Sequence, residues 1–334
     1  MFRLWLDTLR RNSTYLDKTS NGDFQKVHKT QLVIKSHWYI EYGLDEPNGA
    51  FKDDVTGVTL SKKEAKMENY ITADLTYIID DGQPSIRYVD WPEEEHKAHI
   101  AAYEKRTTKI YNGRNTGEKF RLNHHGFLLA NNPTKMLNFY DEDEIRSVYY
   151  PETAELIKRE SGGRQVYIFD HTVRTPLREK QRKGWVREPV RYVHNDYTEL
   201  SAPQRVRDFF PAESRALLES RFAIIQTWRS IASVVESEPL ALCDGKTIPE
   251  TGFIRNQRRY KDRTAETYHI SYNSAHRWYY FPKMRQDEVL VFKVFDTDKD
   301  VKVKFTAHTA FDDPASADDA LPRQSIEMRA LVFF

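Results

Sequence analysis

One histidine in the chain is followed two positions later by an acidic residue: His194 and Asp196, in RYVHNDYT. Side chains two residues apart on a strand point to the same face, so this imidazole and this carboxylate can meet at one ion. They would supply two of the three ligands of a 2-His-1-carboxylate iron(II) site, which leaves three coordination positions open for a co-substrate and O2. In a chain with 50 acidic residues such a pair also arises by chance, and a structural histidine is the alternative.

Three residues nearer the C-terminal end complete such a site. His308 follows Asp196 by 112 residues (308 − 196), Arg323 follows His308 by 15 (323 − 308), and Ser325 comes two positions later. Iron alone does not require that arginine, but 2-oxoglutarate does, because its distal carboxylate is buried and needs a charge-assisted partner to offset desolvation. The order H-x-D, a distant His and then R-x-S therefore predicts Fe(II), 2-oxoglutarate and O2, with Ser325 donating a hydroxyl hydrogen bond.

Other residues compete for two of these positions. His269 and His276 are the remaining candidates for the third metal ligand, although neither has the spacing to Arg323. Arg329 lies six residues (329 − 323) further along the same predicted strand, so it shares a face with Arg323 in a flat strand. It is the rival for the co-substrate carboxylate.

Two further features are less specific. Gln226 and Trp228 share one face of the strand IIQTWRSI and can point into a barrel beside 2-oxoglutarate, with core packing as the alternative. Residues 174–185 form a basic loop just before the metal strand. This loop is interpreted either as a lid that draws in a carboxylate-bearing substrate or as a solvated charged loop.

Composition excludes several classes of function. Lys and Arg number 51 against 50 Asp and Glu, so a net charge of +1 provides no long-range attraction to nucleic acid or an anionic membrane. No apolar run reaches the roughly 18 residues needed to span a bilayer, and no signal peptide is expected. The single cysteine, Cys243, rules out an internal disulfide, which favours a cytoplasmic location. Phosphate-binding, zinc-protease and serine-hydrolase motifs are missing. A small-molecule substrate is the expectation, and a homodimer is compatible with the sequence.

The elements that would position these residues are mostly strands. Alternating or short apolar runs bounded by turn residues predict strands at 31–35, 37–42, 71–79, 125–130, 165–170, 190–194, 222–231, 240–244, 268–272, 277–281, 288–296, 301–308 and 325–334. Helices are predicted at 91–105, 201–207 and 211–221, the first because Pro92 and three glutamates precede lysines. This pattern is typical of a mainly β sandwich or jelly roll with flanking helices.

From about Ile71 to the end, the chain resembles the AsaB/CmcJ group of oxidoreductases, which includes a fungal gibberellin desaturase and a 7α-cephem-methoxylase component. The resemblance is carried by HHGFLL, YYPE, IFDHTVR, VHNDYT, PLALCD and RQSIEMRALVF, and most distinctively by HRWYYFPKM followed by DEVLVFKVFD. Gln226 and Ser230 depart from the group's pattern, which has Asn and Pro there.

The resemblance implies a double-stranded β-helix (jelly-roll) oxygenase domain over residues 71–334, with residues 1–70 as an N-terminal elaboration outside it. The activity implied is oxidation of an unactivated C–H bond in a small specialised metabolite, such as an amino-acid-derived or terpenoid compound, by hydroxylation, desaturation or ring closure. The alternatives are a non-catalytic jelly-roll binding protein and one subunit of a two-component oxygenase.

Overall fold

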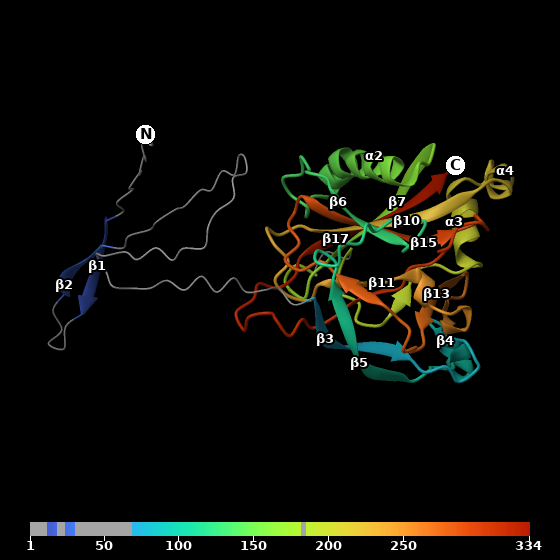
Figure 1. The fold of residues 1–334 in the computed structure, drawn as a ribbon, viewed down its shortest axis with the longest axis horizontal. Helices are drawn as coiled ribbons and strands as arrows, with labels where there is room; N and C mark the ends of the chain where they lie inside the picture. Colours follow the sequence, from blue (N-terminus) through green and yellow to red (C-terminus); the bar gives the residue numbers. More distant parts are fainter. Residues whose placement is uncertain (1–11, 19–23, 31–68, 182–184) are drawn as a thin grey trace, which may run out of the picture. The chain divides into compact units, whose positions relative to one another are not determined.

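The computed structural model describes residues 12–18, 24–30, 69–181 and 185–334 (Figure 1). The chain divides into two compact units, Met1–Ala65 and Lys66–Phe334. In the first, β1 (Asn12–Lys18) pairs antiparallel with β2 (Phe24–Thr30). The strands predicted at 31–35 and 37–42 lie outside the described residues. The division of the chain at residue 70 stays a prediction.

The described strands of the second unit form two sheets. The six-stranded sheet has the order β6 (Phe127–Asn131), β15 (Glu288–Asp296), β10 (Phe222–Ser230), β17 (Ser325–Phe333), β7 (Gln165–Arg174), β8 (Val186–Arg187). The nine-stranded sheet has the order β3 (Tyr70–Ile78), β5 (Tyr103–Asn112), β14 (Trp278–Tyr280), β11 (Leu240–Cys243), β16 (His308–Ala310), β9 (His194–Asn195), β13 (Thr264–Ile270), β12 (Phe253–Arg259), β4 (Ser85–Tyr88).

The order of the central strands makes the fold a jelly roll. Along the chain, β7, β9, β10 and β11 lie in the first and second sheets in turn, and β14, β15, β16 and β17 lie in the second and first sheets in turn. Within each sheet these strands pair antiparallel, in the orders β15-β10-β17-β7 and β14-β11-β16-β9. A chain that passes between two antiparallel sheets in this way forms a double-stranded β-helix. The predicted fold class, mainly β with flanking helices, is confirmed.

Helices lie at the edges and on one outer face of this core. They are the α-helices α1 (Glu142–Glu144), α2 (Tyr150–Ser161), α3 (Ser201–Phe209) and α4 (Ser214–Glu219), the π-helix η2 (Ile145–Tyr149), and the 3₁₀ helices η1 (Pro92–Lys97), η3 (Gly245–Thr247) and η4 (Glu250–Gly252). Helix α2 begins with a proline in its first turn and ends at Gly162, whose φ of 75° is the left-handed conformation that glycine adopts without strain. No helix among the described residues is long and apolar enough to cross a membrane.

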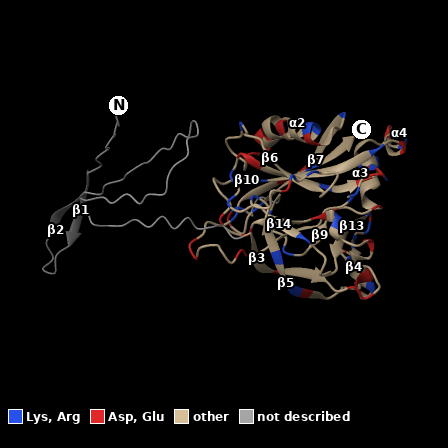
Figure 2. Ribbon diagram, in the orientation of Figure 1, with Lys and Arg blue, Asp and Glu red and all other residues tan. Residues whose placement is uncertain are grey.

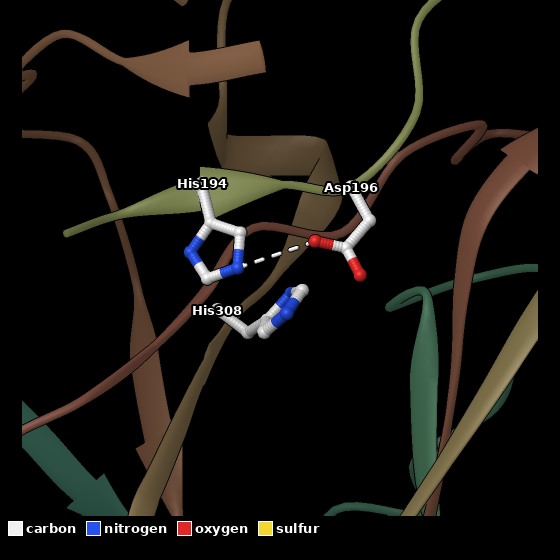
Figure 3. Close-up of side chains that lie close together, drawn as sticks. All are labelled: His194, Asp196 and His308. Atoms are coloured by element: carbon white, nitrogen blue, oxygen red, sulfur yellow. Dashed lines mark ion pairs between the residues drawn. The ribbon is translucent and has the colours of Figure 1, made fainter. Parts of the chain in front are cut away.

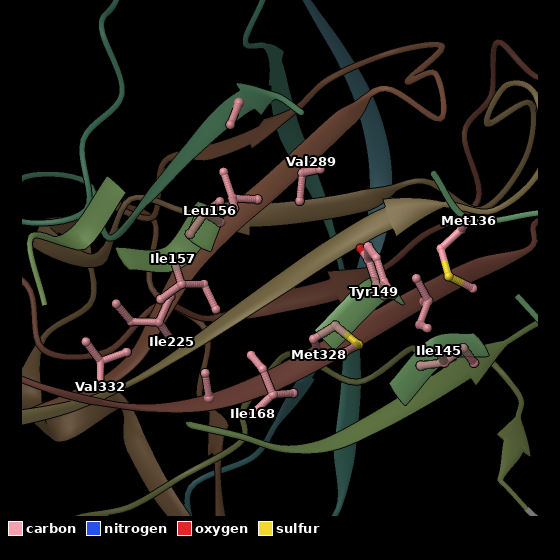
Figure 4. Close-up of a cluster of buried hydrophobic side chains, with 14 of the residues drawn as sticks. Met136, Ile145, Tyr149, Leu156, Ile157, Ile168, Ile225, Val289, Met328 and Val332 are labelled. Carbon is pink, nitrogen blue, oxygen red and sulfur yellow. The ribbon is translucent and has the colours of Figure 1, made fainter. Parts of the chain in front are cut away.

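Alternation along β10 and β17 separates an outer core from an interior. Ile225 and Met328 point outward and pack with Leu156 and Ile157 of α2, which lies on the outer face of the six-stranded sheet (Figure 4). Their neighbours in sequence point the other way, toward the second sheet, where Trp228 belongs to the interior cluster. Because side chains alternate along a strand, the polar residues of β10 and β17 that share the parity of Trp228 must also face the interior.

Two predicted elements are wrong, and the strand predicted at 190–194 is present only at its last residue, where β9 begins. The helix at 91–105 extends only from Pro92 to Lys97; after it, His99 exchanges backbone hydrogen bonds with Ile86 and β5 begins at Tyr103. Pairing with β3 overrides the helical charge pattern. The strand at 301–308 is confined to its end, where β16 begins at His308. The alternating apolar residues of this segment include the buried Val303, but the segment does not pair with a neighbouring strand before His308. The helices expected at 201–207 and 211–221 are present as α3 and α4.

Candidate metal centre

The three residues predicted as metal ligands meet inside the jelly roll. His194 on β9 and His308 on β16 are directly opposite each other on adjacent strands, with ring centroids 4.3 Å apart. Asp196 follows β9 on the same face as His194, and one ligand atom from each residue lies within 4.8 Å of the others (Figure 3). Between them, Asn195 points away and anchors the segment by donating to the carbonyls of Tyr197 (2.6 Å) and Val294 (2.9 Å).

Both histidines present the same nitrogen to the centre. Nδ1 of His194 is 2.7 Å from the Tyr192 carbonyl, and Nδ1 of His308 is 3.4 Å from the Thr306 carbonyl. A carbonyl only accepts, so each Nδ1 carries the hydrogen and each Nε2 keeps a lone pair for a cation. Burial, together with the neighbouring His194, lowers the pKa of His308 to about 3, so its imidazole is neutral at neutral pH. Neutral imidazole is the form that binds metal.

Asp196 is an anion in this setting. Burial alone would raise the pKa of its carboxyl, but the Arg329 guanidinium and His194 hold it well below its usual range. Two imidazoles and one carboxylate that converge in this way form the donor set that suits Fe(II).

The rival histidines lie outside the cluster. His269 is opposite His194 on β13, but its Nδ1 is 2.9 Å from the Tyr103 hydroxyl and its Nε2 is 3.1 Å from Nδ2 of Asn256. Both of its ring nitrogens therefore have protein partners. His276 stacks on Tyr77, with ring centroids 5.8 Å apart.

Arg323 and Ser325 form a second buried polar site at the start of β17. Arg323 is 2% exposed, donates from Nη1 to the Glu238 carbonyl at 2.8 Å, and lies 5.5 Å from the centroid of the Trp228 ring. Within the described part of the chain, Nε of Arg323, Oγ of Ser325 and Nε1 of Trp228 are buried with no hydrogen-bond partner. Each buried donor left without a partner costs about 1–3 kcal/mol.

These donors fit the distal carboxylate of 2-oxoglutarate. Burial lowers the pKa of Arg323 to about 10, so the guanidinium remains a cation at neutral pH, buried and in need of an anion. Arg323 lies two residues before Ser325, the first residue of β17, and Trp228 is a diagonal neighbour of Ser325 on β10. The oxygens of a carboxylate can accept hydrogen bonds from Arg323, Ser325 and Trp228.

Arg329, the rival arginine, is already engaged by the protein. Its guanidinium donates to Asp196 Oδ2 (3.0 Å), Asp170 Oδ2 (2.9 Å), Thr172 Oγ1 (3.1 Å) and a carboxylate oxygen of Glu327. Glu327 also forms a two-point ion pair with Arg174, at 2.7 and 3.0 Å. Arg329 therefore lies beside the candidate metal ligand Asp196, whereas Arg323 keeps a buried Nε without a partner.

The remaining predicted residues have these positions. Gln226 faces the interior as expected, but its Nε2 donates to Asp196 Oδ2 at 2.6 Å. Trp228 faces the interior beside Arg323. Arg174, at the start of the basic loop, is bound internally to Glu327, and residues 182–184 lie outside the described residues, so the lid stays a prediction. Sequence reasoning missed Glu327, although it lies midway between Ser325 and Arg329 in the same alternation.

Comparisons of sequence place the second unit among known oxidoreductases. The profile of the oxidoreductase/YMDC permease-like domain matches residues 69–333. The hydroxylase/desaturase CTB9 of Cercospora beticola is 32% identical over 70% of this chain and 78% of that protein. The Fe(II)/2-oxoglutarate-dependent dioxygenase nvfI of Aspergillus novofumigatus is 31% identical over 67% of this chain and 82% of that protein.

A solved structure shows the same architecture. The iron and alpha-ketoglutarate-dependent endoperoxidase NvfI superposes with a TM-score of 0.70 and 25% identity, over 79% of this chain and 98% of that one.

Proposed function

The chain belongs to the oxidoreductase/YMDC permease-like family, and we propose that it binds one iron(II) ion through His194, Asp196 and His308 and 2-oxoglutarate through Arg323 and Ser325. It is an Fe(II)- and 2-oxoglutarate-dependent dioxygenase, like its relatives. The residue assignment is supported above all by the convergence of the three ligand atoms within 4.8 Å. The buried, unpartnered donors of Arg323 and Ser325 add a site for a carboxylate.

When bound, iron, 2-oxoglutarate and O2 supply an oxidant that removes a hydrogen atom from an unactivated C–H bond, while 2-oxoglutarate becomes succinate and CO2. His194 and His308 contribute neutral nitrogens, and Asp196 contributes the one negative charge. Arg323 fixes the distal end of the co-substrate. The outcome in this family is hydroxylation, desaturation or oxidative ring closure in secondary metabolism.

The substrate is a small molecule. We infer a compact terpenoid, polyketide or amino-acid-derived compound, because the net charge of +1 provides no attraction for a polyanion. Along the ribbon of the second unit, acidic and basic residues are interspersed (Figure 2). A cytoplasmic location and a homodimer stay predictions.

Metal removal tests this function without knowledge of the substrate. The purified protein, given Fe(II), 2-oxoglutarate and O2, should slowly form succinate and CO2 in equal amounts. A chelator should abolish this turnover, and Fe(II) but not Zn(II) should restore it, because Zn²⁺ is redox-inactive. Succinate formation that persists in the chelated protein, or that Zn(II) restores, would contradict the proposal.

A further inference from the structure

We propose that Gln226 and Arg329 are positioning residues that restrict Asp196 to one bond with the metal, through Oδ1. This inference rests on the proposed function, since it concerns how the assigned carboxylate presents itself to iron. Nothing in the sequence pattern assigns either residue to this role.

The two oxygens of the Asp196 carboxylate have different surroundings. Oδ2 accepts a hydrogen bond from Nε2 of Gln226 at 2.6 Å and another from Nε of Arg329 at 3.0 Å. Oδ1 lies 3.3 Å from Nε2 of His194, on the side where the ligand atoms converge. Two donors, one of them charged, thus occupy Oδ2 and leave Oδ1 directed at the centre.

Both donors are fixed by the fold. Gln226 and Arg329 are opposite each other on the paired strands β10 and β17, and both face the interior. Gln226 is fully buried and Arg329 is 8% exposed. Asp170, Thr172 and Glu327 also accept from the guanidinium, so it cannot turn away from Asp196 without breaking two ion pairs and one hydrogen bond. The two donors are therefore pre-organised around Oδ2.

The consequence concerns the number of open positions at the metal. A site with two histidines and one single-bonded carboxylate leaves three positions, of which 2-oxoglutarate takes two and O2 one. A carboxylate that bound through both oxygens would occupy one of these. With 2-oxoglutarate present, the position for O2 would then be lost. Occupying Oδ2 with Gln226 and Arg329 keeps that position available.

Nitric oxide, a stable substitute for O2, provides a test that does not depend on turnover. Anaerobic Fe(II)-loaded protein is titrated with nitric oxide, with and without saturating 2-oxoglutarate, and the high-spin iron–nitrosyl signal is followed by electron paramagnetic resonance. Gln226→Leu keeps the side-chain size and removes the donor; Arg329→Lys keeps the charge. In both variants nitric oxide should bind normally without 2-oxoglutarate. With 2-oxoglutarate bound, the affinity of each variant for nitric oxide should be at least about tenfold lower than that of the wild type, which is equivalent to the loss of one charge-assisted hydrogen bond.

Gln257→Leu is the matched control, because Gln257 also donates from Nε2 at 2.6 Å to a buried carboxylate, that of Glu266, away from the three ligands. It should bind nitric oxide as the wild type does. If Gln226→Leu binds nitric oxide equally well with and without 2-oxoglutarate, or if it fails to retain iron at all, the positioning role is wrong. Should the wild type itself show no effect of 2-oxoglutarate on the nitrosyl signal, the proposed function fails instead.

Discussion

Replacing His308 by Ala should leave the protein folded but unable to retain iron, with no turnover of 2-oxoglutarate. The side chain is one of the three proposed ligands, so its loss should weaken iron binding by more than the roughly 10–100-fold that changes around a metal's ligands cause. The jelly roll should survive, because the backbone pairing of β16 with β11 and β9 does not use the imidazole. Iron content after gel filtration, measured by mass spectrometry, and succinate formation are the readouts.

His269→Ala is the matched control for this change. Its half-buried ring faces His194, at a centroid distance of 6.3 Å, but its nitrogens contact Tyr103 and Asn256. This variant should retain iron in full, although it loses those two contacts. If His308→Ala retains iron and His269→Ala does not, the third ligand is His269.

Replacing Arg323 by Ala should raise the dissociation constant for 2-oxoglutarate by orders of magnitude while iron binding stays nearly normal. Removing one partner of a buried ion pair costs on the order of 3–5 kcal/mol, which is roughly 10²–10³-fold in affinity. Isothermal titration of the anaerobic, Fe(II)-loaded protein with 2-oxoglutarate measures the change.

Variants of two other arginines show whether the effect is specific to Arg323. Arg285→Ala removes an exposed guanidinium paired with Asp287 and should leave the affinity for 2-oxoglutarate unchanged. Arg329→Lys should retain its affinity for 2-oxoglutarate, because the Arg329 guanidinium donates to Asp196. A loss of affinity in Arg329→Lys as large as that in Arg323→Ala, with iron bound normally, would reassign the co-substrate arginine.

Two pairs of candidate site residues could be predicted because each pair is local in the sequence. His194 and Asp196 need only the two-residue alternation of a strand, and the same holds for Arg323 and Ser325. The fold class followed from closely spaced apolar runs. The prediction of a helix at 91–105 was wrong because it rested on a local charge pattern. Pairing of β5 with β3, about thirty residues earlier in the chain, outweighs that pattern.

The partners of Asp196 could not be predicted, because they depend on register. Gln226 is opposite Arg329 only through the alignment of β10 with β17, and both reach Asp196 only because β9 lies in the facing sheet. The sequence alone therefore allowed Gln226 beside the co-substrate and Arg329 as its arginine. The structure places both on the carboxylate of Asp196.

An anaerobic titration followed by visible absorption tests whether this site holds iron and 2-oxoglutarate together. Fe(II)-loaded protein should develop the weak charge-transfer band of the iron–2-oxoglutarate chelate, saturating at one 2-oxoglutarate per iron. His308→Ala should show no band, and Arg323→Ala should show it only at far higher 2-oxoglutarate concentrations. No band in the wild type, or an undiminished band in His308→Ala, would contradict the assignment.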